Sequence, residues 1–301
     1  MLSVGIIGAS GFIGQSLTKR LHLNPSLKIS AFSRTNIKGS SVSWQILDVR
    51  NFDQHFTLFN GLDVIYYLAS DSIPFSSWDN PKADITSNLL PFLNFLEKAV
   101  EAGVKKVVFI SSGGTVYGPS EDKISENAPK VPYSPYGINK LSMEYYLMYY
   151  HQRFGIAYDI FRVSNVYGPG QDITKGLGVI NTFLHDILKK GKITIYGDGK
   201  IIRNYIYIDD VAELLSISVN NIGESRIFNL SSDADLNLNE IISNIKNTVS
   251  EKFHEVYVPG RKSDNPCIRL ENSKILSVVP GFKFKGIREG IEQTYKSMKI
   301  D

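Results

Sequence analysis

The sequence has 301 residues, with 33 lysines and arginines against 30 aspartates and glutamates and a formal net charge of +3 at pH 7. A charge this small does not favour nucleic-acid binding, and the single cysteine, Cys267, excludes an internal disulfide and fits a reducing compartment. The histidines lack metal-ligand spacing, and no apolar run is typical of a membrane helix or a signal peptide. We therefore expect a cytoplasmic protein without a metal, a nucleic-acid partner or a membrane anchor.

The first expected element is a strand over Leu2 to Ile7, an apolar run that leads directly into three evenly spaced glycines. A helix is expected to follow over Gln15 to Leu23. This order indicates a dinucleotide-binding loop, because the glycines allow a tight turn, close approach of the backbone to a pyrophosphate, and close packing of the helix on the strand. The predicted cofactor contacts of this loop are Gly8, Ser10, Gly11, Phe12, Ile13 and Gly14.

The second expected strand, Lys28 to Phe32, ends at Ser33 and Arg34. A site specific for NAD usually has an acid here that binds the ribose 2′-hydroxyl, whereas an arginine suits the 2′-phosphate of NADP. NAD and NADP therefore both stay open as the cofactor. The alternative for Arg34 is that its side chain is only solvated. Asp48 could place its carboxylate near the adenine amino group. The further cofactor contacts that we expect are Ser33, Arg34, Val49, Leu68 and Ala69.

Strand-like runs alternate with helical segments through the first half of the chain. The runs are 4–7, 29–32, 64–68, 107–111 and 157–163, and the helices between them include 89–102 and 136–154. This alternation predicts an α/β fold with a doubly wound parallel sheet, the Rossmann arrangement.

The pattern loosens after Gly168. The expected elements are a turn at 197–199, a helix that begins at Asp210 with Asp209 as its cap, a strand over 228–230, a helix over 239–250 and a turn-rich tail. We expect a dinucleotide-binding domain over residues 1–168. Residues 169–301 should form a smaller C-terminal α/β lobe that mainly binds the substrate, in a crevice outside the strand ends.

Tyr136 and Lys140 lie four residues apart on an expected helix, so their side chains share one face. A free tyrosine titrates near pH ~10 and is a poor base at neutral pH, but an adjacent cation favours the tyrosinate and lowers its pKa. The pair therefore indicates a group that transfers a proton to or from a sugar or alcohol hydroxyl. The glycine loop upstream favours this interpretation over two solvated side chains.

The chain resembles the extended short-chain dehydrogenase/reductase family, in its nucleotide-sugar epimerase/dehydratase branch. The resemblance covers nearly the whole chain, and its motifs occur in the family's order. They are Gly8-x-x-Gly11-x-x-Gly14, Asp48-Val49-Arg50, Ser111 to Gly118, Tyr136-x-x-x-Lys140, Arg162 to Pro169, Arg203 to Asp210, and Arg261-x-x-Asp264.

The resemblance implies that Tyr136 removes or returns the proton of the sugar 4-hydroxyl while the nicotinamide carries the hydride. It implies that Lys140 binds the nicotinamide ribose and tunes Tyr136. The positions expected to bind the nucleotide diphosphate of the substrate are Asn165, Arg203 and Arg261, with Asp264 from the same motif and Asn181 as a further contact. Arginine suits phosphate oxygens, although surface salt bridges and a turn amide are alternatives for these residues.

The chain departs from the family at the catalytic hydroxyl. The family's serine or threonine falls on Gly113, four residues before Tyr117. Ser112 or Thr115 would have to supply the hydrogen bond to the sugar oxygen, and we favour Thr115. The dehydratases carry an Asp-Glu pair where this chain has Gly114 and Thr115, and the decarboxylases place a glutamate at Thr115, so neither reaction is expected.

The function that we expect is that of a nucleotide-sugar 4-epimerase with bound NAD, acting on a UDP-hexose or a UDP-N-acetylhexosamine. Ile268 falls at the family's gate for the N-acetyl group and is smaller than the tyrosine of UDP-glucose-type members. An NADPH-dependent reductase of a 4-keto nucleotide sugar is the alternative, which Arg34 favours. A binding protein that has lost the chemistry is a third hypothesis, which Gly113 keeps open. The resemblance also implies a homodimer through the helical face after Tyr136.

Overall fold

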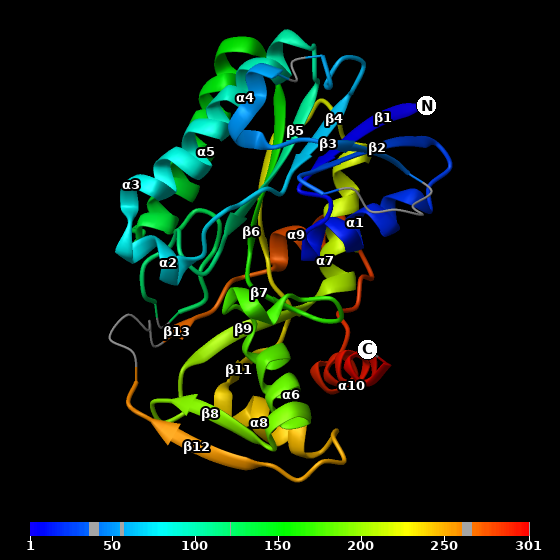
Figure 1. Cartoon of the computed structure of the whole chain (residues 1–301). Helices are drawn as coiled ribbons and strands as arrows, with labels where there is room; N and C mark the ends of the chain where they lie inside the picture. Colours follow the sequence, from blue (N-terminus) through cyan, green and yellow to red (C-terminus); the bar gives the residue numbers. More distant parts are fainter. Residues whose placement is uncertain (36–41, 55–56, 121, 261–266, 301) are drawn as a thin grey trace. The chain divides into compact units, whose positions relative to one another are not determined.

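The computed structural model covers the whole chain and describes residues 1–35, 42–54, 57–120, 122–260 and 267–300 (Figure 1). The chain forms two compact units. The first unit contains Met1–Gly118, Pro129–Arg162 and Ala212–Phe228, and the second contains Pro119–Ala128, Val163–Val211 and Asn229–Asp301. Each unit is built from separate stretches of sequence, whereas we expected one boundary after residue 168. The assignment of cofactor and substrate to two parts of the chain stays a prediction.

A seven-stranded sheet has the order β10-β6-β5-β4-β1-β2-β3. Its strands are β1 (Leu2–Ile7), β2 (Leu27–Ser33), β3 (Ser43–Ile46), β4 (Val64–Tyr67), β5 (Lys106–Ser112), β6 (Ala157–Val163) and β10 (Arg226–Leu230). β1 pairs in parallel with β2 and β4, β2 with β3, and β4 with β5. The order grows outward from β1 on both sides, which is the doubly wound arrangement. The predicted fold class is therefore confirmed.

Helices cover both faces of this sheet. α4 (Leu90–Glu101) and α5 (Pro135–Phe154) lie on one face, and α1 (Phe12–His22) lies on the other (Figure 1). Aromatic rings fill the space under α4: Tyr67 of β4 lies 4.9 Å from Phe92 and 4.8 Å from Phe95 between ring centroids. Because both faces are covered, the central strands are apolar almost throughout, as expected for a parallel sheet.

The helix expected over 89–102 is α4, and the connection that leads to it from β4 is irregular. It contains α2 (Pro74–Asp79), α3 (Pro81–Asp84) and a π-helical turn, η2 (Ile85–Leu89), that leads directly into α4. Such turns insert an extra residue into the helical hydrogen-bond ladder and often occur at functional sites. The remaining short helices near this sheet are η1 (Val49–Gln54) and η4 (Ser216–Asn220).

The helix expected from Asp210 is α7 (Ile208–Leu215). It begins two residues earlier than expected, so Asp209 lies in its first turn and is not its cap. Both Asp209 and Asp210 lie in this first turn, where negative charge is favourable to the helix dipole.

The second unit contains smaller sheets. β9 (Ile202–Tyr207) pairs with β7 (Asn165–Tyr167), β11 (Asp235–Asn237) and β13 (Cys267–Ile268), while β8 (Lys192–Tyr196) pairs with β12 (His254–Val258). Its helices are η3 (Ile173–Lys175), α6 (Val179–Lys190), α8 (Leu238–Lys246), α9 (Ser273–Val278) and α10 (Ile287–Ile300).

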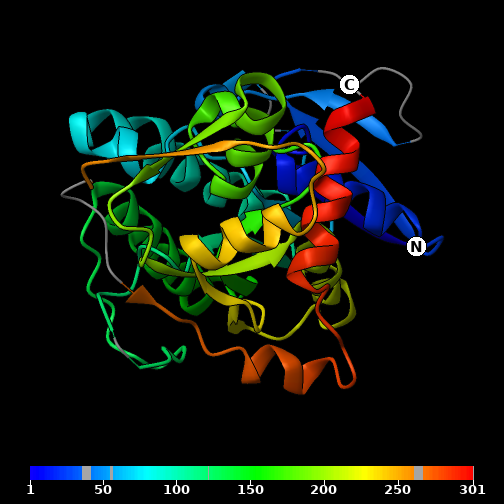
Figure 2. The same cartoon turned by 90° about the horizontal axis from the view of Figure 1, so that it is seen from below.

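The C-terminal tail is more regular than expected. α10 has 14 residues and lies beside α8, where the two helices are red and yellow in Figure 2. The expectation of a turn-rich tail is therefore wrong for this segment. Gly286 immediately precedes α10 and Gly290 is packed inside it, where an added Cβ would lie 2.2 Å from the hydroxyl of Tyr167. Gly286 therefore precedes a packed helix, and Gly290 lies inside that helix without interrupting it.

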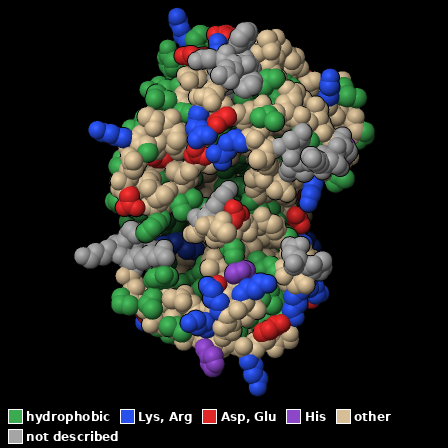
Figure 3. All heavy atoms as spheres, viewed as in Figure 1, with side chains coloured by type: hydrophobic (Ala, Val, Ile, Leu, Met, Phe, Trp, Pro, Cys, Tyr) green, Lys and Arg blue, Asp and Glu red, His purple; other side chains and the backbone are tan. Residues whose placement is uncertain are grey.

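The surface agrees with the small net charge. On the face drawn in Figure 3, basic and acidic side chains are interspersed. Across the described ranges, the structure contains no helix that is both long enough and apolar enough to cross a membrane.

Candidate active site

The glycine loop joins β1 to α1 as predicted. Gly8 has a φ of +85°, and a Cβ there would lie 2.9 Å from the backbone nitrogen of Ala69. A Cβ at Gly14 would lie 2.3 Å from the carbonyl oxygen of Gly8. Both contacts exclude a side chain, because such distances are shorter than van der Waals contact. The loop therefore lies directly against the end of β4, which brings Gly8 close to Leu68 and Ala69.

The start of α1 is open to an anion. Gly11 is the N-cap, no side chain caps the helix, and its first turn has no acidic residue. The backbone N–H groups at the start of a helix lack intrahelical partners and carry partial positive charge. Ser10 uses its carbonyl oxygen to accept a 2.8 Å hydrogen bond from Gln15. These features fit a dinucleotide pyrophosphate at Gly11, Phe12 and Ile13.

The side chains after β2 and β3 form an ion-pair cluster. Arg34 lies 3.1 Å from Asp71, and Arg50 lies 3.5 Å from Asp71. Arg50 also forms a bidentate pair with Asp48, and its hydrogen bonds lower the pKa of Asp48 to about 2. Asp71, from the segment after β4, therefore balances the charge of Arg34, so Arg34 is not simply a solvated side chain.

Of the other two expected contacts in this region, Ser33 is buried and Val49 is partly buried. Ser33 is buried and donates its hydroxyl hydrogen bond to the carbonyl oxygen of Thr35. Val49 packs against the core. Both positions are compatible with a backbone contact to a cofactor, so Ser33 and Val49 stay predicted cofactor contacts.

Tyr136 and Lys140 lie in the first turns of α5. Ser134 caps this helix by accepting a 3.1 Å hydrogen bond from the backbone N–H of Gly137, and Pro135 occupies the first helical position. Lys140 Nζ lies 5.6 Å from the centroid of the Tyr136 ring and donates a 3.0 Å hydrogen bond to the carbonyl oxygen of Ile110. The predicted pair is therefore present on one helix face, with its cation anchored to β5.

The pKa of Tyr136 differs from our expectation. Burial, together with the Asp84 carboxylate, raises the pKa of Tyr136 to about 12. Burial lowers the pKa of Lys140 to about 8, against the opposing effects of Asp84 and Glu144. The expected lowering of the tyrosine pKa by its neighbouring cation is therefore wrong for the protein alone, because burial and the Asp84 carboxylate both oppose ionisation of the phenol.

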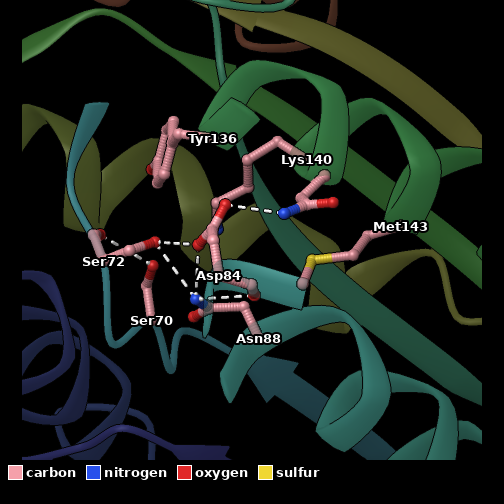
Figure 4. Close-up of a pocket in the computed structure, with 8 residues that line it drawn as sticks. Ser70, Ser72, Asp84, Asn88, Tyr136, Lys140 and Met143 are labelled. Atoms are coloured by element: carbon pink, nitrogen blue, oxygen red, sulfur yellow. Dashed lines mark hydrogen bonds between the residues drawn. The ribbon is translucent and has the colours of Figure 1, made fainter. Parts of the chain in front are cut away.

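Sequence reasoning missed a polar cluster beneath this pair. Ser70, Ser72, Asp84 and Asn88 line a small pocket together with Tyr136 and Lys140, and Asn139 and Met143 complete it (Figure 4). Asp84 and Asn88 are four residues apart in the helical segment that leads into α4. This spacing is the only signal in the sequence, because it places the two polar side chains on one helix face.

The candidate hydroxyl groups lie in the turn after β5. Thr115 is 4% exposed, and its Oγ1 is buried without a hydrogen-bond partner. Ser112 is half-buried, and its carbonyl oxygen accepts hydrogen bonds from the backbone N–H groups of Thr115 and Val116. An added Cβ at Gly137 would lie 2.4 Å from the carbonyl oxygen of Thr115, so α5 packs directly on this turn. A buried hydroxyl without a partner is rare, so the Thr115 hydroxyl is a candidate to form a hydrogen bond with a ligand.

An ion pair lies one turn further along α5. Glu144 and Arg162 are both buried, with 2.6 Å between Oε2 and the guanidinium, and Arg162 also donates a 2.7 Å hydrogen bond to the hydroxyl of Tyr117. Ser111 donates its hydroxyl to Glu144. This network fixes α5 to β5 and β6 behind the pair.

The expected substrate contacts fall in the second unit. Arg203 is half-buried on β9, opposite Ile268 of β13 in the strand register. Asn165 is exposed and donates a 2.9 Å hydrogen bond to the carbonyl oxygen of Asn204. Asn181 is fully buried and exchanges hydrogen bonds with the backbone of Gly168. Arg261 and Asp264 lie outside the described residues.

A doubly wound sheet, a glycine loop after its first strand and a Tyr–Lys pair beside β5 define a dinucleotide-dependent enzyme of the short-chain type. The chain belongs to the NAD dependent epimerase/dehydratase family, whose profile matches residues 4–231. The predicted family is therefore confirmed.

Individual relatives agree with this membership. The chain is 30% identical to the UDP-glucose 4-epimerase of Mycolicibacterium smegmatis, with 96% of each chain covered. It is 33% identical to the dTDP-4-dehydro-6-deoxyglucose reductase of Escherichia coli over 80% of this chain and 76% of the relative. The structure of the Thermus thermophilus UDP-glucose 4-epimerase in complex with NAD matches with a TM-score of 0.90 and 28% identity, covering 99% of both chains.

Proposed function

We propose that the protein is a nucleotide-sugar 4-epimerase that acts on a UDP-hexose or a UDP-N-acetylhexosamine with bound NAD. The observation that carries this proposal is the Tyr136–Lys140 pair beside a turn that holds the unpartnered hydroxyl of Thr115. Together they supply a proton carrier and a hydrogen-bond donor for one sugar oxygen. Membership of the epimerase family supports the same reaction class.

NAD is the cofactor that the residues fit. The loop at Gly8 to Gly14 would hold its pyrophosphate, and Lys140 its nicotinamide ribose. Asp71 already balances the charge of Arg34, so a 2′-phosphate would have to compete with a carboxylate. The Thermus thermophilus relative, which contains NAD, supports this choice over NADP. When bound, NAD supplies a reversible acceptor for the hydride.

The chain's own residues then move the proton. Tyr136 Oη takes the proton of the 4-hydroxyl as the C4–H bond breaks and its hydrogen leaves as a hydride, which gives a 4-keto sugar. After the sugar has turned over, the hydride returns to the opposite face of C4, and Tyr136 returns the proton to O4. A pKa of about 12 keeps Tyr136 protonated at neutral pH, so ligand binding must lower this pKa before the first step.

The second unit would bind the nucleotide. Arg203 and Arg261 suit the diphosphate, Asn165 and Asn181 are further candidates, and Asp264 belongs to the same motif as Arg261. Ile268, which pairs in register with Arg203, is the candidate gate for an N-acetyl group. Its side chain is smaller than a tyrosine ring, which supports a site that admits the N-acetylhexosamine.

The reductase alternative is less well supported. The Escherichia coli reductase matches 80% of the chain, whereas the Mycolicibacterium smegmatis epimerase matches 96%. The Arg34 cation that favoured NADP is paired with Asp71. The binding-protein hypothesis is also less well supported, because Tyr136 and Lys140 share one face of α5 beside an unpartnered hydroxyl.

We also propose that the protein forms a homodimer through α5. Tyr145, Tyr146 and Tyr149 are 57%, 40% and 53% exposed and line a shallow apolar pocket with Ser142. Exposed aromatic clusters of this kind mark interaction surfaces. Light scattering on the wild type and on Tyr149→Glu tests the proposal: a dimer that the variant converts to a monomer supports it, and a wild-type monomer contradicts it.

The experiment that tests the function combines cofactor and reaction. The purified protein is denatured and any released dinucleotide identified, while fresh enzyme is incubated with UDP-glucose and with UDP-N-acetylglucosamine without added reductant. Released NAD and a new 4-epimer are expected. Bound or preferred NADP without an epimer would favour the reductase and 4-keto sugars as substrates.

A further inference from the structure

A buried carboxylate beside the Tyr136–Lys140 pair has no part in the function proposed above. Asp84, the last residue of α3, is 3% exposed. Its Oδ1 accepts hydrogen bonds from the hydroxyl of Ser72 and, at 2.7 Å, from Asn88 Nδ2, while its Oδ2 accepts one from Asn139 Nδ2 at 2.6 Å. Figure 4 shows the Asp84 side chain at the centre of this cluster. A buried carboxylate is tolerated only with such partners.

The three donors come from separate segments of the first unit. Ser72 follows β4, in the segment that begins with the expected cofactor contacts Leu68 and Ala69. Asn88 lies in the π-helical turn η2, and Asn139 lies in α5 directly before Lys140. Two further contacts link the same segments: Asn88 accepts a 2.8 Å hydrogen bond from the backbone N–H of Asp71, and Asn88 donates a 3.1 Å hydrogen bond to Ser72.

We propose that Asp84 is a positioning residue of the active site: by binding Ser72, Asn88 and Asn139 together, it fixes the first turns of α5 against the segment after β4. It thereby sets the place of Tyr136 and Lys140 relative to the cofactor-binding side of the sheet. The protein itself forms the hydrogen bonds of Asp84. Only the predicted effect on turnover rests on the proposed epimerase function.

The charge of Asp84 acts on the same pair. Its carboxylate raises the pKa of Tyr136 and that of Lys140, because a negative charge opposes ionisation of a phenol and stabilises an ammonium. The other charged group that acts on Lys140 is Glu144 of the same helix, which is itself paired with Arg162. Removal of the Asp84 charge should therefore lower both pKa values.

The test compares Asp84→Asn with the wild type in two measurements. In cofactor-free protein labelled with ¹³C at the lysine Cε, the Lys140 signal, assigned with Lys140→Arg, reports its titration. We expect the midpoint to move to lower pH by about one unit or more. In the epimerase assay, the acidic limb of kcat/KM should move in the same direction, and kcat should fall about tenfold.

Two control variants separate charge from position. Asp79→Asn removes an exposed acid of α2 and should leave the Lys140 titration and the pH profile unchanged. Asn139→Ala keeps the Asp84 charge and removes one anchor, so kcat should fall while the Lys140 midpoint stays within a few tenths of a unit. This variant also carries the test if Asp84→Asn does not fold.

Each outcome decides the proposal. An unchanged Lys140 midpoint in folded Asp84→Asn would overturn it, as would unchanged kcat in Asn139→Ala. If the wild type has no epimerase activity, the proposed function fails, but the lysine titration still decides whether Asp84 acts on the pair.

Discussion

Lys140 donates a 3.0 Å hydrogen bond from its Nζ to the carbonyl oxygen of Ile110, which ties α5 to β5 at the candidate active site. The ammonium also lies 5.0 Å from the centroid of the Phe109 ring. One backbone oxygen and an aromatic face are a poor replacement for water, so the charge of Lys140 is held at a cost in folding free energy.

This cost predicts that Lys140→Met stabilises the protein at neutral pH. The folded-state pKa of about 8 lies below the ordinary lysine value of 10.5, so the unfolded chain binds the proton more tightly. The unfavourable contribution of Lys140 is therefore full below pH 8 and fades as the pH rises toward 10.5. Urea unfolding should show a gain of about 1–3 kcal/mol at pH 7 that shrinks at alkaline pH. A variant less stable than the wild type at pH 7 would contradict this interpretation.

Tyr136→Phe should remove most of the turnover, by about 10²- to 10⁴-fold in kcat, because it removes the hydroxyl that is proposed to carry the proton. Nucleotide binding, measured by calorimetry, should stay close to that of the wild type. The matched control is Tyr145→Phe, which removes the hydroxyl of an exposed tyrosine on the same helix and should keep full activity. Equal activity in Tyr136→Phe and the wild type would remove Tyr136 from the mechanism.

Thr115→Val should lower kcat more than Ser112→Ala. The Thr115 hydroxyl is buried and unpartnered, so its loss removes a bond that forms only with the ligand, worth about a tenfold to hundredfold change in rate. For the same reason, Thr115→Val should not destabilise the protein, and it should raise the free energy of unfolding by about 1 kcal/mol, because it removes a buried hydroxyl that has no partner. The opposite ranking of the two variants in kcat would assign the role to Ser112.

Glu144→Gln should destabilise the protein by about 3–5 kcal/mol in urea unfolding, because it leaves the buried Arg162 guanidinium without its counter-charge. The matched control is Glu292→Gln, which breaks an exposed pair with Lys296 and should cost less than about 1 kcal/mol. Similar losses in the two variants would show that the Glu144–Arg162 pair does not anchor α5.

The sequence was sufficient wherever the structural reason is local. Gly8 has a positive φ and Gly14 packs on the nearby backbone of Gly8, while Tyr136 and Lys140 need only one helix turn, so these features were predictable from spacing. The alternation of apolar runs and helices likewise predicted the doubly wound sheet.

Features that depend on distant contacts were not predictable. Asp71 balances Arg34 from 37 residues away, and Asp84 meets Asn139 from 55 residues away. The direction of the Tyr136 pKa shift also escaped prediction, because it depends on how deeply the phenol is buried and on Asp84, and neither is visible in the Tyr-x-x-x-Lys spacing.

The most direct test of the central claim follows the hydrogen at C4. UDP-glucose and UDP-N-acetylglucosamine, each deuterated at C4, are incubated with the purified enzyme without added cofactor, and the products are analysed by NMR and mass spectrometry. We predict a 4-epimer that keeps the deuterium at C4 with the wild type and almost none with Tyr136→Phe. Absence of an epimer from both sugars, or an epimer that has lost its deuterium to water, would contradict a 4-epimerase that moves the hydride within its own active site.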